Sequence, residues 1–464
     1  MTNTPPLADT LGMSEDDMRR LGYEMVDMVV QHLASRHDEP AIAVTARAAL
    51  EAKIGGPVPL KPSDASSALL TLRNEVLSKM QHGDHPRYFA RVASPAAFTG
   101  ILGDWLATGF NAIATSWIGG SGTAVLELVV LDWLRQLLGM PDGTQGIIVS
   151  GGSLANFTAF SAAFASKGRG TVYLNDQTHS SLKRNLTSAG LAESDIRVLP
   201  TDSQQKFDMV GLTQAITADR ASGRKPVMVI ANAGTTNTGA ADPLTEVAAL
   251  CRAEGLWMHV DGAYGGPAAL TARGKAHLAG LELADSLVLD PHKWLFQPYD
   301  CGCVLVRHAG ALERAFTMTP EYLKDVMGKE DEVDFFNRSL ELSRKARALK
   351  LWMTFKTHGV ERIAAAIDAG IDLAEAAQRL ILLDPQHWEL VTPAQIGIVT
   401  FARRGATAAG HAAMVQDITQ SGYATLSSTV IAKRSVLRLC TLNPMTTEAD
   451  ISGTLDRLLS VPLA

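Results

Sequence analysis

The chain has 464 residues, a formal net charge of −6, and 46% hydrophobic against 19% charged residues. This length predicts about two to four domains, and the composition allows a large buried core. The charge gives no broad basic surface, so we expect no nucleic-acid or membrane partner. The four cysteines are too few for a disulfide scaffold.

The first residues and the cysteines give no sign of export or of metal binding. Residues 1–20 lack a basic stretch followed by an apolar one, so we expect no signal peptide. No uninterrupted apolar run is long enough to span a bilayer. Cys301-Gly-Cys303 lacks the CxxC spacing of a zinc or redox pair. We therefore expect a cytoplasmic protein without a metal site.

Residues 1–90 are predicted to form a helical segment. Ser14-Glu-Asp-Asp17 resembles a capping box, and apolar residues then recur at helical spacing up to Leu33. A proline-containing stretch, residues 40–62, separates this helix from a second one, from about Asp64 to Met80. Both helices are amphipathic, so their apolar faces need covering.

Residues 91–380 are predicted to form a large α/β domain. Two helices are expected over residues 95–140, around a glycine-rich break at residues 119–122. Short apolar runs then alternate with helix-length segments, which predicts βα units and a mainly parallel, seven-stranded central sheet. The predicted strands are residues 147–149, 172–174, 196–199, 227–231, 256–260, 286–289 and 303–306. Because only a short loop separates the last two, we expect one edge strand to run antiparallel.

The large domain is predicted to end in a long helix, and the rest of the chain is predicted to form a second domain. The helix covers about residues 340–380, and residues 381–464 alternate short strands and helices. This alternation predicts a small C-terminal α+β domain.

Three candidate functional groups follow predicted strand ends, where ligands gather in an open α/β sheet. Ser150-Gly-Gly-Ser153 precedes a predicted helix, whose free N–H groups suit a phosphate; a plain structural turn is the alternative. Asp261 ends a buried strand and needs a partner, which a helix cap or a salt bridge would also provide. His179 follows another strand, and a surface or core histidine is the simpler interpretation.

Lys293 is the fourth candidate. It lies in Asp290-Pro-His-Lys-Trp-Leu-Phe296, just after an apolar run, where a lysine is hard to keep both charged and dry. Its amine becomes a nucleophile if desolvation or a nearby cation lowers its pKa. Together the four groups supply a phosphate cradle, a carboxylate, an aromatic ring and an amine for a Schiff base. Pyridoxal 5′-phosphate (PLP) requires this set.

An ordered series of motifs gives a specific resemblance. The chain resembles the group II PLP-dependent decarboxylases, and among them the aromatic L-amino acid decarboxylases, from about residue 15 to about residue 445. The matching stretches are HPRYF, SGGSLAN, NDQTHSS, GTTNTG, HVDGAYGG, DPHKWLF, YLKD and SRKARALKLW. The resemblance implies the PLP-dependent transferase fold (fold type I) and a homodimer, in which residues 1–90 are the dimerisation segment and the active site lies at the subunit boundary.

The resemblance also implies roles for single residues. Lys293 would form the Schiff base, Asp261 would pair with the pyridinium nitrogen, and His179 would stack on the ring. The other cofactor contacts would be Gly152, Ser153, Thr236, Ala263 and His292. Tyr322, in Tyr-Leu-Lys-Asp325 on a mobile loop, would protonate the substrate carbon.

The implied substrate pocket departs from the family pattern. Arg91, Val92 and Thr115 stand where aromatic residues are common, and Ile113 and Ser343 complete the predicted pocket. Arg91 would hold an acidic side chain by a charge-assisted bond, or it is a surface arginine. Asp290 replaces a common asparagine and Met445 a common arginine, which changes details of the phosphate surround.

The predicted activity is decarboxylation of an aromatic L-amino acid by a PLP-dependent carboxy-lyase. An acidic or small amino acid is the alternative substrate, supported only by Arg91. The PHKW context of the lysine argues against transamination, and tyrosine rather than phenylalanine at position 322 argues against an aldehyde synthase. Intact Lys293, Asp261 and His179 argue against an inactive scaffold.

Overall fold

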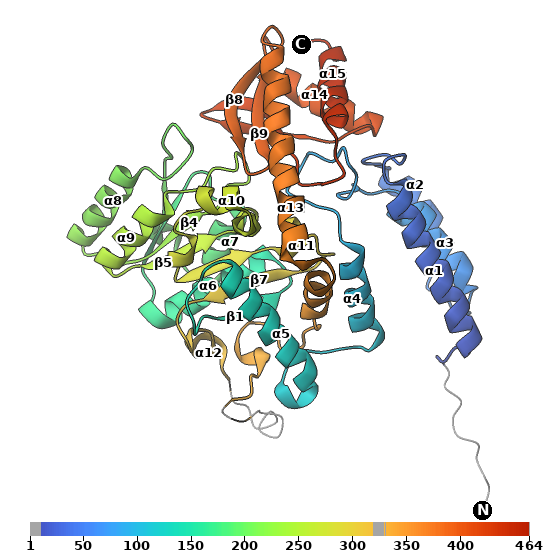
Figure 1. Cartoon of the computed structure of the whole chain (residues 1–464), viewed down its shortest axis with the longest axis horizontal. Coiled ribbons are helices and arrows are strands. Elements are labelled where there is room, and N and C mark those ends of the chain that lie inside the picture. Colours follow the sequence, from blue (N-terminus) through green and yellow to red (C-terminus); the bar gives the residue numbers. More distant parts are fainter. Residues whose placement is uncertain (1–10, 319–328, 330, 464) are drawn as a thin grey trace, which may run out of the picture.

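The computed structural model describes residues 11–318, 329 and 331–463. It has three parts: a large α/β body, a small C-terminal unit above it, and an N-terminal helical arm that projects from the body (Figure 1). The parts follow one another in the order that the sequence predicts, although the last long helix is shared between two of them.

A seven-stranded sheet forms the centre of the body, in the order β1-β7-β6-β5-β4-β2-β3. Every predicted strand is present: β1 (Gln145–Val149), β2 (Thr171–Asn175), β3 (Ile196–Leu199), β4 (Pro226–Asn232), β5 (Trp257–Asp261), β6 (Ser286–Leu289) and β7 (Gly302–Val306). The strand β7 runs opposite to the other six, so its pairings with β1 and β6 are antiparallel and all other pairings in this sheet are parallel. The expectation of an antiparallel edge strand is wrong in its position. The short loop fixes β7 beside β6, but β1 then pairs with the free side of β7.

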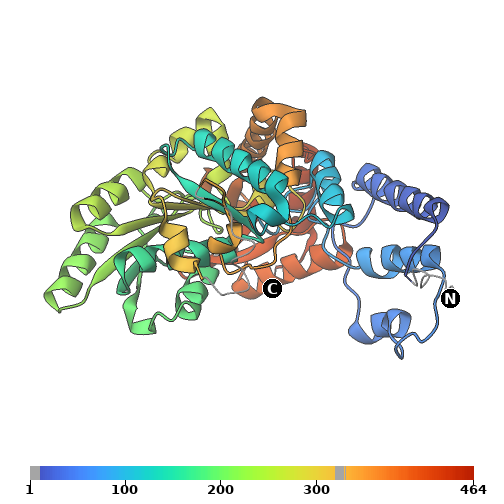
Figure 2. The ribbon, with the colours of Figure 1, turned by 90° about the horizontal axis from the view of Figure 1, so that it is seen from below.

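Helices cover both faces of this sheet, which Figure 2 shows from below. They are α6 (Gly152–Lys167), α7 (Ser180–Ser188), α8 (Met209–Ala221), α9 (Leu244–Glu254), α10 (Ala272–His277), α11 (Pro291–Trp294) and α12 (Ala311–Phe316). Because both faces are covered, β4 to β7 are buried along their whole length. This explains why these strands are continuous apolar runs rather than alternating ones.

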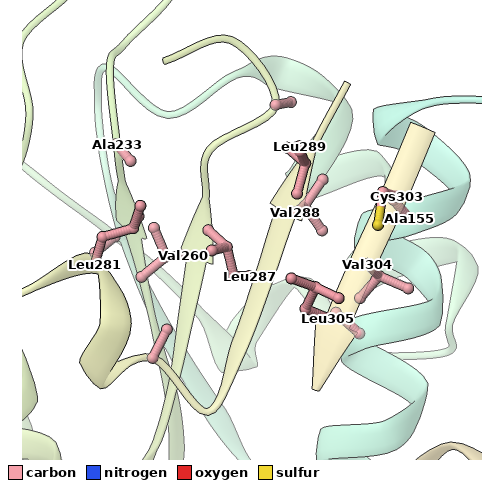
Figure 3. Packing of buried hydrophobic residues seen from close by; sticks show 14 of the residues in the cluster. Ala155, Ala233, Val260, Leu281, Leu287, Val288, Leu289, Cys303, Val304 and Leu305 are labelled. Carbon is pink, nitrogen blue, oxygen red and sulfur yellow. The ribbon is translucent and has the colours of Figure 1, made fainter. Parts of the chain in front are cut away.

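Packing in the middle of the sheet is dense. Figure 3 shows Val260 of β5, Leu287 and Val288 of β6 and Val304 of β7 among the packed side chains, beside α6. Ala155 on α6 is also fully buried, and its small side chain lets the helix approach the sheet closely. This rigid core holds the strand ends, and the loops that follow them, in fixed positions.

The N-terminal arm consists of short and long helices that pack mainly on one another. They are α1 (Glu15–Ser35), α2 (Arg47–Ile54), α3 (Ala65–Thr71) and a π-helix (Leu72–Leu77) that continues α3. Ser14 and Asp64 cap α1 and α3 by accepting backbone N–H groups. None of α1, α2 and α3 has a buried residue, so the apolar faces of the arm are open in the single chain.

Two helices, α4 (Phe98–Gly109) and α5 (Trp117–Leu137), join the arm to the sheet. The predicted break at residues 119–122 is present as a kink at Gly120 within α5, and α4 and α5 themselves separate earlier, at residues 110–116. The Ser116 side chain accepts a hydrogen bond from the N–H of Gly119 and so starts α5. The glycines fall in its first turn, where Gly120 makes a kink with φ −172° and ψ 67°.

In the part of the chain that the structure describes, α5 alone is long and apolar enough to cross a membrane, judged by length and composition only. Charged residues interrupt it. Glu127 is fully buried and pairs with the buried Arg344, with Oε1 and Nη2 2.7 Å apart. The helix also packs against β1 and against α13 (Ala348–Leu383). These contacts belong to the packing of the body.

The long helix α13 connects the body to the C-terminal unit (Figure 1). It kinks at Gly359, whose φ of 68° favours glycine. The unit contains an antiparallel sheet in the order β10-β11-β9-β8. Its elements are β8 (Trp388–Gln395), β9 (Ile398–Arg403), α14 (Ala408–Ser421), β10 (Ser427–Ile431), β11 (Arg434–Cys440) and α15 (Glu448–Ser460). Tyr88 forms a bridge with Thr425, so the chain after the arm is anchored on this unit.

Candidate active site

A hollow of 380 Å³ lies where β2, β4, β5 and β6 end. Its walls come from segments that are far apart in the sequence. The lining includes all eight residues predicted to contact a cofactor: Gly152, Ser153, His179, Thr236, Asp261, Ala263, His292 and Lys293. The sheet therefore brings the predicted cofactor residues to one place.

One wall of the hollow suits an anionic group. It is the turn from β1 into α6, whose first N–H groups have no partner inside the helix and favour negative charge. A Cβ at Gly152 would lie 2.8 Å from Oδ2 of Asp290, and a Cβ at Gly151 would lie 3.1 Å from Cε1 of His292. Side chains at these positions would fill the cradle, so the glycines keep it open.

Lys293 projects from α11 toward the carboxylate of Asp290. Its Nζ lies 2.9 Å from Oδ2 of Asp290, whose side chain is 3% exposed. Burial alone would lower the pKa of Lys293, but the charge and hydrogen bond of Asp290 and the charge of Asp261 together raise that pKa. The pairing with Asp290 therefore outweighs the effect of burial at this lysine. The amine is charged and paired.

Trp294 anchors the turn that carries Lys293. Its buried ring stacks on Tyr264, with 5.5 Å between centroids and 14° between planes. Gly370 of α13 and Gly397 before β9 leave space for the indole, since a Cβ at either would lie 3.2 Å from it. Ser94 also donates a hydrogen bond to the carbonyl oxygen of Lys293. The residue after the lysine is thus fixed in the core, while the lysine faces the hollow.

Asp261 ends β5 with its carboxyl group in the hollow. Its Oδ1 accepts a hydrogen bond from the N–H of Ala263 at 3.0 Å. Burial raises the pKa of Asp261, and the charge of nearby Lys293 opposes that shift. A positively charged group bound beside this carboxylate would stabilise its ionised form.

The two histidines of the hollow are held in defined tautomers. Nδ1 of His292 accepts the N–H of Cys301 at 3.1 Å, and Nδ1 of His179 accepts the N–H of Ser181 at 3.3 Å. In each neutral ring the proton therefore lies on Nε2. Burial lowers the pKa of His292 and also that of His179. His179 is the more exposed of the two residues in the single chain. Both rings are mainly neutral near pH 7.

A buried hydrogen-bond network supports the strand ends. Asp242 accepts the backbone N–H of Asn232 at 2.7 Å and the side-chain amide of Asn175 at 3.0 Å. It thereby joins the ends of β4 and β2. Burial raises the pKa of Asp242 to about 6 even though these N–H donors oppose the shift.

The predicted substrate residues do not line this hollow. Arg91 is exposed and donates to Oε1 of Gln81, and Val92 is buried in the core. Ile113 forms a bridge with Lys345, which places residues 113–115 beside Ser343. Thus Ile113, Thr115 and Ser343 lie together, apart from Arg91 and Val92. The single chain assembles the predicted cofactor site but not the predicted substrate pocket.

Tyr322, the predicted proton donor, lies outside the residues that the structure describes. Asp290, which the resemblance places only in the phosphate surround, and Asn232, which the sequence did not single out, also line the hollow. The signal for Asp290 was its position three residues before Lys293, and the signal for Asn232 was its place at the end of a buried apolar run.

Comparison with known proteins agrees with this geometry. Residues 50–404 match the family model described as the pyridoxal-dependent decarboxylase conserved domain. The chain belongs to the pyridoxal-dependent decarboxylase family. It is 42% identical to an aromatic-L-amino-acid decarboxylase of Bacillus atrophaeus, over 96% of this chain and 95% of that protein. It is 28% identical to a phenylacetaldehyde synthase of Arabidopsis thaliana, over 95% and 94% of the two chains.

The fold of this decarboxylase is also that of solved relatives. It superposes with a TM-score of 0.91 on a crystal structure of Oryza sativa TDC with PLP and tryptamine, covering 97% of this chain and 98% of that one at 27% identity. Both the fold type and the cofactor predicted from the sequence are confirmed.

The hollow fits PLP on its own chemistry. The glycine cradle at the start of α6 offers space and N–H groups for the phosphate. Buried Asp261 offers a negative charge for the ring nitrogen, and Lys293 offers the amine for covalent attachment. Oδ1 of Asp290 is buried without a hydrogen bond in the described structure, so this wall retains an unused acceptor for a ligand.

Proposed function

We propose that this chain removes the carboxyl group of an aromatic L-amino acid, giving the amine and carbon dioxide. The observation that carries the proposal is that Lys293, Asp261 and His179 line one hollow with a phosphate cradle. The aromatic substrate is supported by the relative from Bacillus atrophaeus, which matches nearly the whole chain at 42% identity.

Bound PLP supplies a conjugated ring that accepts the electron pair left when the carboxyl group departs. Asp261 keeps a proton on the ring nitrogen, because its buried negative charge stabilises the protonated form. Neutral His179, in the wall of the hollow, would face the ring of bound PLP and would leave the departing carboxyl group without a positive charge to hold it. Lys293 would hold the cofactor through its amine.

Proton delivery completes the reaction. We assign it to Tyr322, whose phenol would protonate the substrate carbon inside a closed site from which water is excluded. If this proton is not delivered, dioxygen and water would convert the carbon to the aldehyde with release of ammonia and hydrogen peroxide; an aldehyde is the product in the name of the relative from Arabidopsis thaliana. Aldehyde synthesis is therefore the second candidate function.

We also propose a homodimer. Exposed apolar residues run from the arm along α4 and α5, including Tyr23, Leu72, Leu106, Phe110 and Ile118. A surface of this kind needs a partner. Ile113 belongs to the same exposed surface, and Ser343 lies beside it. A second copy that covers this surface would receive Ile113, Thr115 and Ser343 into its own active site.

Mixed dimers test this arrangement. The Lys293→Ala and Ser343→Trp chains are each expected to be inactive as homodimers. A dimer of one with the other regains activity if Ser343 serves the partner's site, because one site then has an intact lysine and an intact serine. Continued inactivity of the mixed dimer, with both chains folded, would place Ser343 in the site of its own chain.

We place the protein in the cytoplasm, where thiols stay reduced. The four cysteines are all buried and free. Fractionation of the source cells tests this location, and recovery of the protein outside the cytoplasm would contradict it.

The activity itself is tested with a panel of L-amino acids and PLP. Carbon dioxide and amine are expected in equal amounts from tryptophan, tyrosine, phenylalanine or their hydroxylated forms. A preference for acidic amino acids would reject the aromatic substrate class. Aldehyde and ammonia in place of amine would favour the second candidate function.

A further inference from the structure

Histidines and carboxylates gather where the N-terminal arm meets the segment that leads into the body. His32 lies in the last turn of α1, Glu39 lies in the turn that follows, and His82 lies in the loop after the π-helix. Their donor atoms are all within 4.8 Å of one another. We propose that His32, Glu39 and His82 bind a divalent transition-metal ion such as Zn²⁺, with Asp84 orienting His32.

The distances around His32 fit such a site. Its Nδ1 lies 3.1 Å from Oε2 of Glu39. Two ligands on a tetrahedral zinc ion with bonds of about 2.0–2.1 Å are about 3.3 Å apart. On the other side of the ring, Nε2 lies 2.9 Å from Oδ2 of Asp84. A carboxylate that accepts the second N–H of a ligating histidine is the usual support of a metal site.

His82 provides the third donor. It is 7% exposed, and its ring makes no hydrogen bond to any residue that the structure describes. The ring centroid lies 5.5 Å from that of His32, so a small approach of the two rings would put one nitrogen of each on the same ion.

The surrounding charges favour a cation. Glu39 and Asp84 flank His32, and the nearest positive group is Arg36, whose Nη1 lies 4.0 Å from Oδ2 of Asp84. The two carboxylates and Arg36 together carry one more negative than positive charge, and a metal ion would replace the proton that His32 holds between the two carboxylates. Ser35 donates to Oε1 of Glu39 at 2.9 Å, which orients the carboxylate and leaves Oε2 for the ion. The side chains of His32 and Glu39 are 34% and 35% exposed, so solvent ions reach them.

The ion would join two segments of the chain at the joint of the arm. His32 and Glu39 belong to α1 and its following turn, whereas His82 belongs to the loop that leads into the body. The nearby His85 is committed elsewhere, because its Nε2 bonds the carbonyl oxygen of Glu39 at 3.0 Å. The metal site shares no residue with the hollow at Lys293.

Metal titration of the PLP-loaded protein tests the proposal. After treatment with a chelator, the protein is titrated with Zn²⁺ against a chromophoric chelator, and with Co²⁺ to read the ligand set from its spectrum. We expect one ion per chain, bound by nitrogen and oxygen. Affinity should fall about tenfold to a hundredfold or more in His32→Ala, His82→Ala and Glu39→Gln, and also in Asp84→Asn.

His387→Ala is the matched control, because His387 also pairs with a carboxylate, Asp384, but lies in the C-terminal unit. It should bind zinc as the parent does, and circular dichroism should show that every variant is folded. Unchanged zinc affinity in His32→Ala and Glu39→Gln would overturn the proposal. An equal loss in His387→Ala, or a Co²⁺ spectrum with thiolate bands, would also overturn it.

Discussion

Lys293, whose side chain is 22% exposed, and buried Asp290 form an ion pair in the hollow, with Nζ and Oδ2 2.9 Å apart. Asp290 lies directly before α11, and Lys293 is the third residue of that helix. Asp290 raises the pKa of Lys293 against the effect of burial. The amine of Lys293 is therefore protonated in the chain without cofactor, and it must lose a proton before it can attack the aldehyde of the cofactor.

Replacing Asp290 with asparagine should change the pH dependence of cofactor attachment. Without the carboxylate, burial lowers the pKa of Lys293 and more of the amine is neutral at a given pH. The rate of imine formation after mixing the apoprotein with PLP should therefore reach its half-maximum at a lower pH in Asp290→Asn. Stopped-flow absorbance measures this rate. Identical pH profiles for the parent protein and Asp290→Asn would show that Asp290 does not set the pKa of Lys293.

Asp261→Asn should retain part of the cofactor affinity and lose most activity. The neutral amide cannot stabilise a proton on the ring nitrogen, so the ring accepts electrons poorly. The absorbance spectrum of the loaded variant and its turnover number are the measurements. Turnover near that of the parent, with cofactor bound, would show that another group holds the proton.

Tyr322→Phe should change the distribution of products more than it changes the rate of decarboxylation. Carbon dioxide release should fall less than amine formation, because the phenol acts only after the carboxyl group has left. Aldehyde, ammonia and peroxide should rise, since the unprotonated intermediate reacts with oxygen. Amine and aldehyde are measured in one reaction. An unchanged ratio at the normal rate would assign proton delivery to another residue.

His259 should make the fold sensitive to acid. Its Nε2 bonds Oδ1 of Asn156 at 2.7 Å, and its Nδ1 bonds Oγ of Ser286 at 2.8 Å. Burial lowers the pKa of His259 from 6.5 to about 3. This lowered pKa stabilises the fold fully above pH 6.5, and the contribution is lost as the pH falls from 6.5 toward 3.

The free energy of unfolding should therefore fall by as much as about 1.4 kcal/mol per pH unit for this one proton. Denaturant titrations at several pH values and one protein concentration measure the slope. His259→Gln, which offers an amide in place of the imidazole, should have a shallower slope below pH 6.5. Equal slopes for the two proteins would show that His259 does not control the acid sensitivity.

Much of the body could be predicted because its signals are local. The strands from β4 to β7 are short apolar runs; Asp261 is the last residue of β5, and Lys293 lies in the short helix that follows β6. Strands that are parallel place such residues at one edge of the sheet. The motifs then identified the cofactor, which local physical signals alone left open.

Features set by contacts between distant residues could not be predicted. The place of β7 inside the sheet depends on β1, which is more than 150 residues earlier in the chain. The helix α2 lies in a stretch whose prolines favour a loop. Ser116 rather than the glycines sets the start of α5. His32 and His82 meet only in the folded chain, so their spacing resembles no metal motif.

The most direct test of the account is to locate the lysine that binds the cofactor. The PLP-loaded protein is reduced with borohydride and digested, and the labelled peptide is sequenced by mass spectrometry. The account predicts the label on Lys293 and its loss in Lys293→Ala. Lys350 is the informative competitor, because its side chain is also buried and 1% exposed. A label on Lys350, or on any lysine other than Lys293, would contradict the account.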